Sequence, residues 1–239
     1  MRDLALKENP TRPWDSQQPY TVTYQLLFGS FPSPSPAGQG YDVQSKGKAI
    51  TNFSGPERRW FFLYKRLPKP TSERVDYTDE DTDAFAVEFA ECPLTRTVKV
   101  KDVWPRMLGA GLTNLDEGIV KNWSFERIVL GGDSCHKMTT HLGLRFNHGT
   151  QDVVVLCNSL RKAIRAAPSG VLDTKILTAL FERYQAVRMS SVRSLKGDYL
   201  AVPNVVEDLF MHFVMAPEFR KGQLLDYVAK EERMRGKIS

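Results

Sequence analysis

The first third of the chain carries many of its hydrophobic residues in short runs that end at Pro, Gly and Ser clusters, in the manner of strands. The run Thr21 to Phe31, TVTYQLLFGSF, is rich in β-branched and aromatic residues and ends in the loop composition PSPSPAGQG. A second run, Arg59 to Arg66, is dense in aromatic residues, and Pro68 and Pro70 predict its end. The segment Tyr41 to Phe53 predicts one or two shorter strands between these runs. Together they predict an antiparallel sheet.

Later segments change to helical spacing. Thr78 followed by DEDTD predicts an N-cap and an acidic first turn, in a helix that ends before Pro93. The acidic cluster is therefore interpreted as complementing the helix dipole and not as a metal site. An extended piece is expected at Val98 to Val100. Three more helices are predicted: one beginning near Gly143 and ending at Pro168, one at Leu172 to Val192, and one at Val205 to Met215.

Composition limits the class of protein. A chain of 239 residues with 41% hydrophobic and 26% charged residues can bury a sizeable core. The net charge of +5 is spread along the chain, so no nucleic acid partner is expected. The three cysteines show no C-x-x-C spacing, which indicates a reducing compartment such as the cytoplasm. The helix at Val205 to Met215 is amphipathic; packing on the domain and peripheral membrane contact both stay open for it.

The most specific pattern runs from Arg127 to Asp152, RIVLGGDSCHKMTTHLGLRFNHGTQD. The apolar run RIVL predicts a buried strand that ends at a glycine pair, which lets the backbone approach a ligand closely. Asp133 at the strand end can accept hydrogen bonds from a hydroxyl group. A helix that begins near Gly143 would direct its positive end and free N–H groups at an electron-rich group.

This pattern closely resembles the second FAD fingerprint of the aromatic-hydroxylase flavoproteins, G-D-A/S-x-H-x-x-x-P-x-x-G-Q-G-x-N followed by an acid. The matching positions are Gly132, Asp133, Ser134, His136, Gly143, Asn147 and Asp152. HKMT after GDS is typical of the fungal branch that oxidises prenylated indoles, meroterpenoids and related polyketides. The resemblance implies an FAD-dependent, NAD(P)H-consuming monooxygenase that hydroxylates or epoxidises a hydrophobic small molecule. It also implies a tyrosine that faces the substrate at Tyr24, and cofactor contacts at Gly132, Asp133, Gly143, Phe146 and Asn147.

The chain also departs from that family. It contains no G-x-G-x-x-G turn, and Gly109 to Asn114, which lacks the third glycine, is expected to be a loop. Leu144 and Arg145 replace the second and third residues of the Gly-Gln-Gly that faces the flavin. Arg145 could pair with an anionic reduced flavin, but the bulk of Leu-Arg-Phe favours crowding of the ring position.

Two functional hypotheses follow from these departures. The first is a truncated C-terminal part of a fungal monooxygenase, with a separate N-terminal half as its partner. The second is a redox-dead homologue that acts as a non-oxidative cyclase, isomerase or binding protein. No metal is expected, because Cys135, His136, His141 and His148 match no zinc spacing. A serine hydrolase is not expected either, because GGDSC is not a G-x-S-x-G elbow.

The expected fold is α+β. We expect a substrate-side antiparallel sheet over residues 1–105, a partial FAD-binding layer over 106–168, and C-terminal helices over 169–239. Because the last two regions resemble elements that pack on a dinucleotide-binding sheet, some apolar surface is expected to be uncovered.

Overall fold

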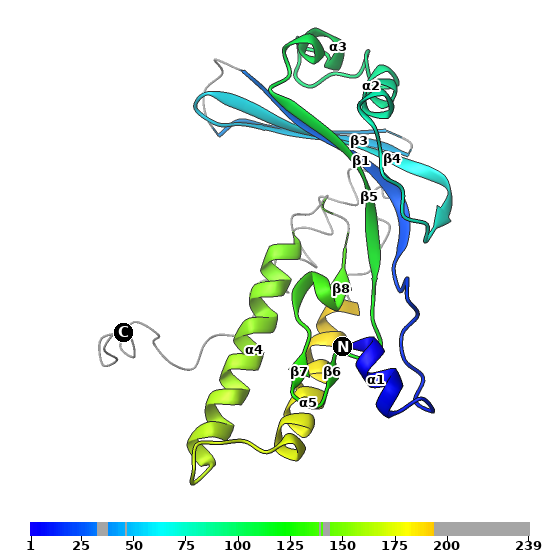
Figure 1. Ribbon diagram of the computed structural model, residues 1–239. Coiled ribbons are helices and arrows are strands. Elements are labelled where there is room, and N and C mark those ends of the chain that lie inside the picture. Colours follow the sequence, from blue (N-terminus) through cyan, green and yellow to red (C-terminus); the bar gives the residue numbers. More distant parts are fainter. Residues whose placement is uncertain (33–37, 46, 139, 141–143, 194–239) are drawn as a thin grey trace.

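A computed structural model describes residues 1–32, 38–45, 47–138, 140 and 144–193 (Figure 1). Its main feature is a six-stranded sheet with the strand order β2-β3-β4-β1-β5-β8, in which neighbouring strands are antiparallel. The strands are β1 (Thr21–Pro32), β2 (Gly40–Ser45), β3 (Lys48–Ser54), β4 (Arg58–Thr71), β5 (Gly109–Ile119) and β8 (His136–Lys137). The antiparallel sheet expected from the first third of the chain is therefore confirmed.

One face of the sheet is covered by short helices. Leu27, Phe61 and Leu63 point from the sheet into a core that also contains Phe85 and Phe89. The helices on this face are α2 (Asp79–Val87), α3 (Val100–Val103) and the 3₁₀ turn η1 (Trp104–Arg106). The predicted start of α2 is confirmed, because Thr78 and Asp81 form a reciprocal capping box.

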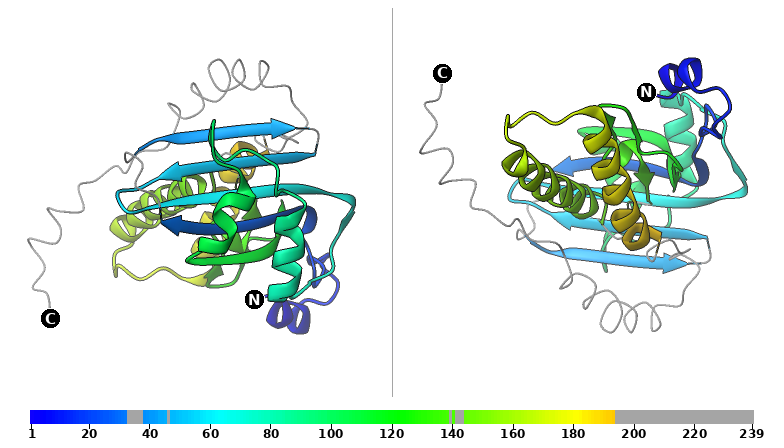
Figure 2. Two further views of the ribbon diagram at one scale, coloured as in Figure 1. Left: turned by 90° about the horizontal axis from the view of Figure 1, so that it is seen from above. Right: turned by 90° about the horizontal axis from the view of Figure 1, so that it is seen from below.

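The remaining described elements lie on the opposite side of the sheet, where α4 and α5 are seen on the far side from α2 and α3 (Figures 1 and 2). The elements here are α1 (Arg2–Glu8), the hairpin of β6 (Ser124–Phe125) and β7 (Ile128–Val129), the 3₁₀ turn η2 (Gly132–Ser134), α4 (Leu144–Ala166) and α5 (Thr174–Arg193). Trp123, Cys135 and Tyr184 form the centre of a second core between them. The start of α4 within one residue of Gly143 confirms the helix predicted there, and α5 confirms the next.

Three local predictions were wrong. Gly109 to Asn114 is not a loop but the start of β5, which pairs with β1 from Gly109–Ser30 to Glu117–Thr21. Gly111 serves packing, because a side chain there would meet the ring of Phe28 at 2.8 Å, so the strand can hold this glycine where local preference predicts a loop.

The strand β4 also continues through Pro68 and Pro70 to Thr71. Its pairing with β3 ends at Lys65, so the prolines lie where only β1 is its neighbour and a missing N–H is tolerated. The extended piece predicted at Val98 to Val100 is found in part: Lys99 is extended and forms a β-bridge with Pro93, and Val100 begins the helix α3.

The run RIVL is the third exception. Only Ile128 and Val129 are strand, they pair with Ser124 and Phe125, and Ile128 is 41% exposed. The prediction of a buried strand was therefore wrong, because a run this short is buried only where other elements cover both its faces.

The boundaries at 105 and 168 stay predictions, although β5 lies beyond position 105 and completes the sheet of β1. The helix predicted at Val205 to Met215 lies outside the described residues. Among the helices that are described, none has the length and apolar composition needed to cross a bilayer.

Candidate functional site

The fingerprint loop is organised by one buried carboxylate. Asp152 of α4 is 1% exposed, and its Oδ2 accepts a hydrogen bond from the backbone N–H of Gly132 at 2.7 Å. The same oxygen lies 2.6 Å from Nε2 of His136, and Oδ1 accepts a hydrogen bond from Nε of Arg188 at 2.6 Å. One side chain thus connects η2, β8 and α5 to α4, which explains the acid at the end of the fingerprint.

The environment of this network shifts the pKa values of Asp152 and His148. Burial raises the pKa of Asp152, but the hydrogen bonds from His136, Arg188 and Gly132 outweigh burial and leave that pKa below its ordinary value. Burial and then the charge of Arg188 lower the pKa of His148 to about 4. The neutral His148 ring has its Nδ1 3.1 Å from Nη2 of Arg188.

Ligand atoms of Cys135, His136 and Asp152 lie within 4.8 Å of one another. Burial and then Asp152 raise the pKa of the Cys135 thiol, so it stays protonated, and Asp152 is already occupied by a guanidinium. Asp152 pairs with His136 and Arg188, and the Cys135 thiol donates a hydrogen bond to the carbonyl of Gly132, so the chemistry of the group does not favour a cation.

Asp133 lies on the surface beside this network. Gly132 precedes it with a φ of +59°, a conformation that favours glycine, and turns the chain away from the core. The Asp133 side chain is 54% exposed, and its Oδ2 lies 3.4 Å from Nη1 of Arg145. Asp133 follows β7 as predicted and lies in a single 3₁₀ turn, with one carboxylate oxygen shared with a cation.

Arg145 does not extend freely from the helix. Its Nε donates a hydrogen bond to the carbonyl of Met138, and its Nη2 donates one to the carbonyl of Asp116 in β5. The side chain therefore fastens the start of α4 to the sheet. In the bulky run Leu-Arg-Phe, the side chain of Phe146 is exposed, at 81%. Asn147 is also exposed on the first turn, and Gly143 lies outside the described residues.

Tyr24 lies on the sheet face that looks toward α4 and α5. It is 2% exposed and packs with Leu26, Tyr64 and Leu115. The hydroxyl of Tyr64 lies 3.2 Å from Oγ1 of Thr140, in the fingerprint loop, so this face and the loop are in direct contact. Tyr24 does not line the described cleft, and its catalytic role stays a prediction.

The same face also carries exposed apolar side chains that the sequence analysis did not single out. Phe28 and Phe53 are each 45% exposed and Trp60 is 37% exposed. Phe53 lies close to Trp60, with ring centroids 6.0 Å apart. Strand alternation could have identified them, because they share a face with Tyr24.

Sequence reasoning also missed Arg188. The sequence contains a pattern that could have identified it, because Arg188 lies at helical spacing within an otherwise apolar stripe. The buried face of α5 consists of Leu177, Phe181, Tyr184, Arg188 and Val192. A cation within such a stripe predicts a buried anion, and Asp152 is that anion.

The exposed groups fit the flavin end of FAD. The Asp133 carboxylate can accept a hydrogen bond from a hydroxyl group, and the first turn of α4 has backbone N–H groups without intrahelical partners. The positive end of a long helix favours a group that becomes negative on reduction. The described residues therefore offer the donors, the acceptor and the exposed surface that the flavin end requires.

Comparison with known proteins defines the class first. The family described as "FAD binding domain" matches residues 57–179, and the chain belongs to this family. FAD is the cofactor of the family, and the α+β fold is that of a partial aromatic hydroxylase.

The individual relatives are fungal. The chain is 42% identical over 165 residues to the FAD-dependent monooxygenase SAT1 of Stachybotrys chartarum, covering 68% of this chain and 56% of SAT1. It is 31% identical over 217 residues to the FAD-dependent monooxygenase ausM of Aspergillus calidoustus, covering 87% of this chain and 46% of ausM. The chain thus spans about half the length of these relatives. The crystal structure of the tetracycline destructase Tet(51) shares the fold, with a TM-score of 0.62 at 13% identity over 92% of this chain and 60% of that one.

Proposed function

We propose that the chain supplies the substrate-side sheet and the flavin-side loop of an FAD-dependent monooxygenase of fungal secondary metabolism. The enzyme would hydroxylate or epoxidise a hydrophobic meroterpenoid, prenylated indole or polyketide, with NAD(P)H as the reductant. The observation that carries the proposal is the contact between Tyr64 and Thr140, which joins an aromatic sheet face to the fingerprint loop. Substrate and cofactor would meet at such a junction.

Each part of the chain has a separate task in this proposal. FAD, when bound, supplies the oxidation chemistry. The protein binds and orients the substrate and the cofactor, and it excludes water from the site. Asp133 holds a hydroxyl of the cofactor, and the α4 N-terminus favours negative charge on it. Phe28, Phe53 and Trp60 offer an apolar surface to the substrate, and Tyr24 remains the catalytic candidate on that face.

A partner segment is the second part of the proposal. Phe146, Val153 and Ile164 lie at helical spacing on α4 and are 81%, 58% and 45% exposed. Such a stripe on a long helix is typical of a surface that packs on another element. We propose that a dinucleotide-binding segment, supplied as a separate N-terminal half, covers it. Peripheral membrane contact through residues 205–215 also stays a proposal.

The test uses a fusion of the N-terminal part of SAT1 to this chain. Asp133→Ala should weaken FAD binding roughly 10- to 100-fold, since a hydrogen bond to a charged group contributes about 1.5 to 3 kcal/mol. FAD content after gel filtration and fluorescence titration measure this loss. Asp76→Ala is the matched control, because Asp76 is equally acidic, exposed and far along the chain from the fingerprint. Equal FAD affinity in the two variants would remove Asp133 from the cofactor site.

The same fusion tests Tyr24. Tyr24→Phe should keep its FAD content and lower substrate-stimulated NAD(P)H oxidation, whereas unchanged turnover would remove Tyr24 from the catalytic candidates.

The redox-dead alternative is favoured by one observation, the ion pair of Arg145 with Asp133. If this pair blocks the cofactor, the unmodified fusion should contain no FAD and Arg145→Gly should restore binding. A yellow unmodified fusion would contradict this alternative.

A further inference from the structure

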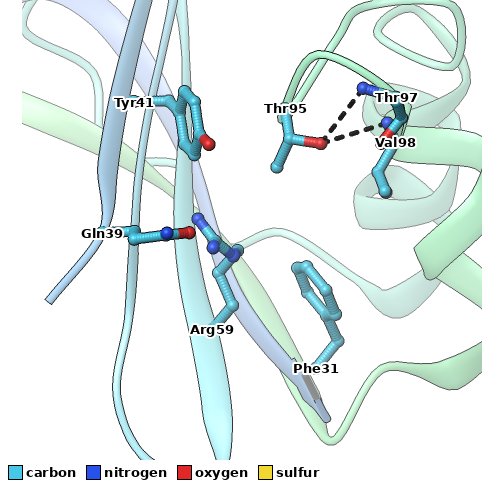
Figure 3. A pocket seen from close by; sticks show the side chains of 7 residues that line it. All are labelled: Phe31, Gln39, Tyr41, Arg59, Thr95, Thr97 and Val98. Atoms are coloured by element: carbon cyan, nitrogen blue, oxygen red, sulfur yellow. Dashed lines mark hydrogen bonds between the residues drawn. The ribbon is translucent and has the colours of Figure 1, made fainter. Parts of the chain in front are cut away.

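The sheet face under α2 and α3 contains a cleft of about 230 Å³, on the opposite side of the sheet from Tyr24 and the fingerprint loop. Its lining includes Phe31, Gln39, Tyr41, Arg59, Thr95 and Val98 (Figure 3). Arg59 and Phe31 are register partners on β4 and β1, so both side chains enter the cleft from the sheet. The proposed monooxygenase reaction uses none of these residues.

Arg59 is the unusual member of this lining. It is only 2% exposed, yet among the described residues no carboxylate forms an ion pair with it. Its Nη1 donates a hydrogen bond to Oδ1 of Asn52 at 2.6 Å, and its guanidinium carbon lies 5.5 Å from the ring centroid of Tyr41. A buried cation without an anion is costly, and proteins usually pair such groups.

The position of Arg59 is fixed by a second buried residue. Asn52 is 1% exposed, and its Nδ2 donates a hydrogen bond to the carbonyl of Leu94 at 2.5 Å. Asn52 therefore holds one nitrogen of Arg59 and leaves Nε and Nη2 without a hydrogen bond in the described chain. These two nitrogens form the edge of a guanidinium that binds a carboxylate with two parallel hydrogen bonds.

The surroundings of the guanidinium are polar on one side and apolar on the other. Figure 3 shows the amide end of Gln39 beside the guanidinium, with Tyr41 on the same side and Phe31 opposite. Neither the Gln39 amide nor the Tyr41 hydroxyl has a hydrogen-bond partner in the described part of the chain. The hydroxyl of Thr95 accepts hydrogen bonds from the N–H groups of Thr97 and Val98. These bonds fix the turn that places Val98 in the lining, where Val98 and Phe31 form the apolar wall of the cleft.

We propose that this cleft binds a small organic monocarboxylate. Its carboxylate would accept hydrogen bonds from Arg59 and from the free donors of Gln39 and Tyr41. Its short apolar part would lie against Phe31 and Val98. A single cation with an apolar wall matches one negative charge on an apolar body, and it matches a multiply charged inorganic anion less well.

The test measures binding of sodium butyrate to the full chain by calorimetry and thermal shift at constant ionic strength. Butyramide, which lacks the charge, and sodium phosphate, which lacks the apolar part, are the comparison ligands. Butyrate should bind saturably, and Arg59→Met should weaken it roughly 10- to 100-fold, as expected for loss of charge-assisted hydrogen bonds. Arg58→Met is the matched control, because Arg58 is the neighbouring exposed residue and loses the same charge. It should leave butyrate binding unchanged.

A second variant keeps the test decisive if Arg59→Met does not fold. Gln39 is exposed, so Gln39→Glu should fold and should place a competing carboxylate beside Arg59. It should weaken butyrate binding by a similar factor. The proposal is overturned if butyrate does not bind saturably, if phosphate or butyramide binds as well as butyrate, or if Arg58→Met weakens binding as much as Arg59→Met. Unchanged binding in a folded Arg59→Met or Gln39→Glu variant would also overturn it.

Discussion

Asp152 is the residue on which the fingerprint loop depends most. It accepts hydrogen bonds from Gly132 and Arg188 and contacts His136, all in a buried setting. Its partners come from three elements, so this one carboxylate fixes the position of Asp133 on the surface. We therefore expect Asp152 to support cofactor binding by positioning Asp133, without itself touching the cofactor.

Asp152→Asn should destabilise the fold by about 3 to 5 kcal/mol, because it leaves the buried Arg188 without a counter-charge. Urea denaturation followed by far-UV circular dichroism measures this loss. Glu182→Gln makes the same chemical change on the exposed face of α5 and should cost less than about 0.5 kcal/mol. If the two variants were equally stable, the ion pair would contribute nothing.

The same network predicts a pH dependence. The pKa of His148 is about 4 in the fold and 6.5 as its ordinary value, so the unfolded chain binds this proton first as the pH falls. The stabilisation that His148 contributes is fully present above pH 6.5 and is lost as the pH falls toward about 4. Asp152, whose folded pKa is lowered, adds a further loss only below its ordinary value of 3.8.

Urea midpoints measured between pH 6.5 and about pH 4 would show the loss of stability that His148 protonation causes. The variant His148→Gln should flatten the dependence of the urea midpoint on pH. A wild-type stability curve that does not fall between pH 6.5 and pH 4 would contradict the half-buried neutral state of His148.

At the scale of elements, α2 shows how a local signal produces a helix. Thr78 and Asp81 cap each other's backbone N–H groups, and Phe85 and Ala86 are buried against the sheet. The helix contains only nine residues, so the cap and this burial carry most of its stability.

Thr78→Ala should therefore destabilise the fold by about 1 kcal/mol, the usual cost of a lost N-cap. Thr78→Ser keeps the capping oxygen and should be nearly neutral. Chemical denaturation of the two variants makes the comparison, and equal losses would show that the methyl group, and not the cap, matters.

On the scale of the whole molecule, the two sides of the sheet carry different chemistry. The side of α4 and α5 holds the fingerprint loop, Tyr24 and the exposed apolar residues of α4. The side of α2 and α3 holds the cleft with Arg59. A ligand in that cleft would be separated from the flavin side by the sheet.

The 239-residue chain expressed by itself should be colourless and should not oxidise NADPH. Tight FAD binding needs a glycine-rich turn for the pyrophosphate, and the sequence contains no G-x-G-x-x-G. Loss of several charge-assisted contacts at about 1.5 to 3 kcal/mol each weakens binding by several orders of magnitude. Visible absorbance and FAD titration measure this. A yellow preparation, or dissociation in the low micromolar range, would show that Asp133 and the α4 N-terminus suffice.

Several features could be predicted from the sequence because their causes are local. The β-branched and aromatic content of a run closed by a Pro/Gly/Ser loop predicted β1, the capping residue predicted α2, and helical spacing predicted α4 and α5. The fingerprint predicted Asp133 after a strand and before a helix, because glycine and helix-start signals act over a few residues.

Other features were decided only by the tertiary structure, because their causes are long-range. Gly109 to Asn114 became a strand because β1 pairs with it, against its local preference. Arg188 meets Asp152 across 36 positions, and Asn52, which accepts the hydrogen bond of Arg59, bonds to Leu94 across 42 positions. Pairing and burial of this kind depend on which segments meet in space. Residue type and local spacing do not contain that information.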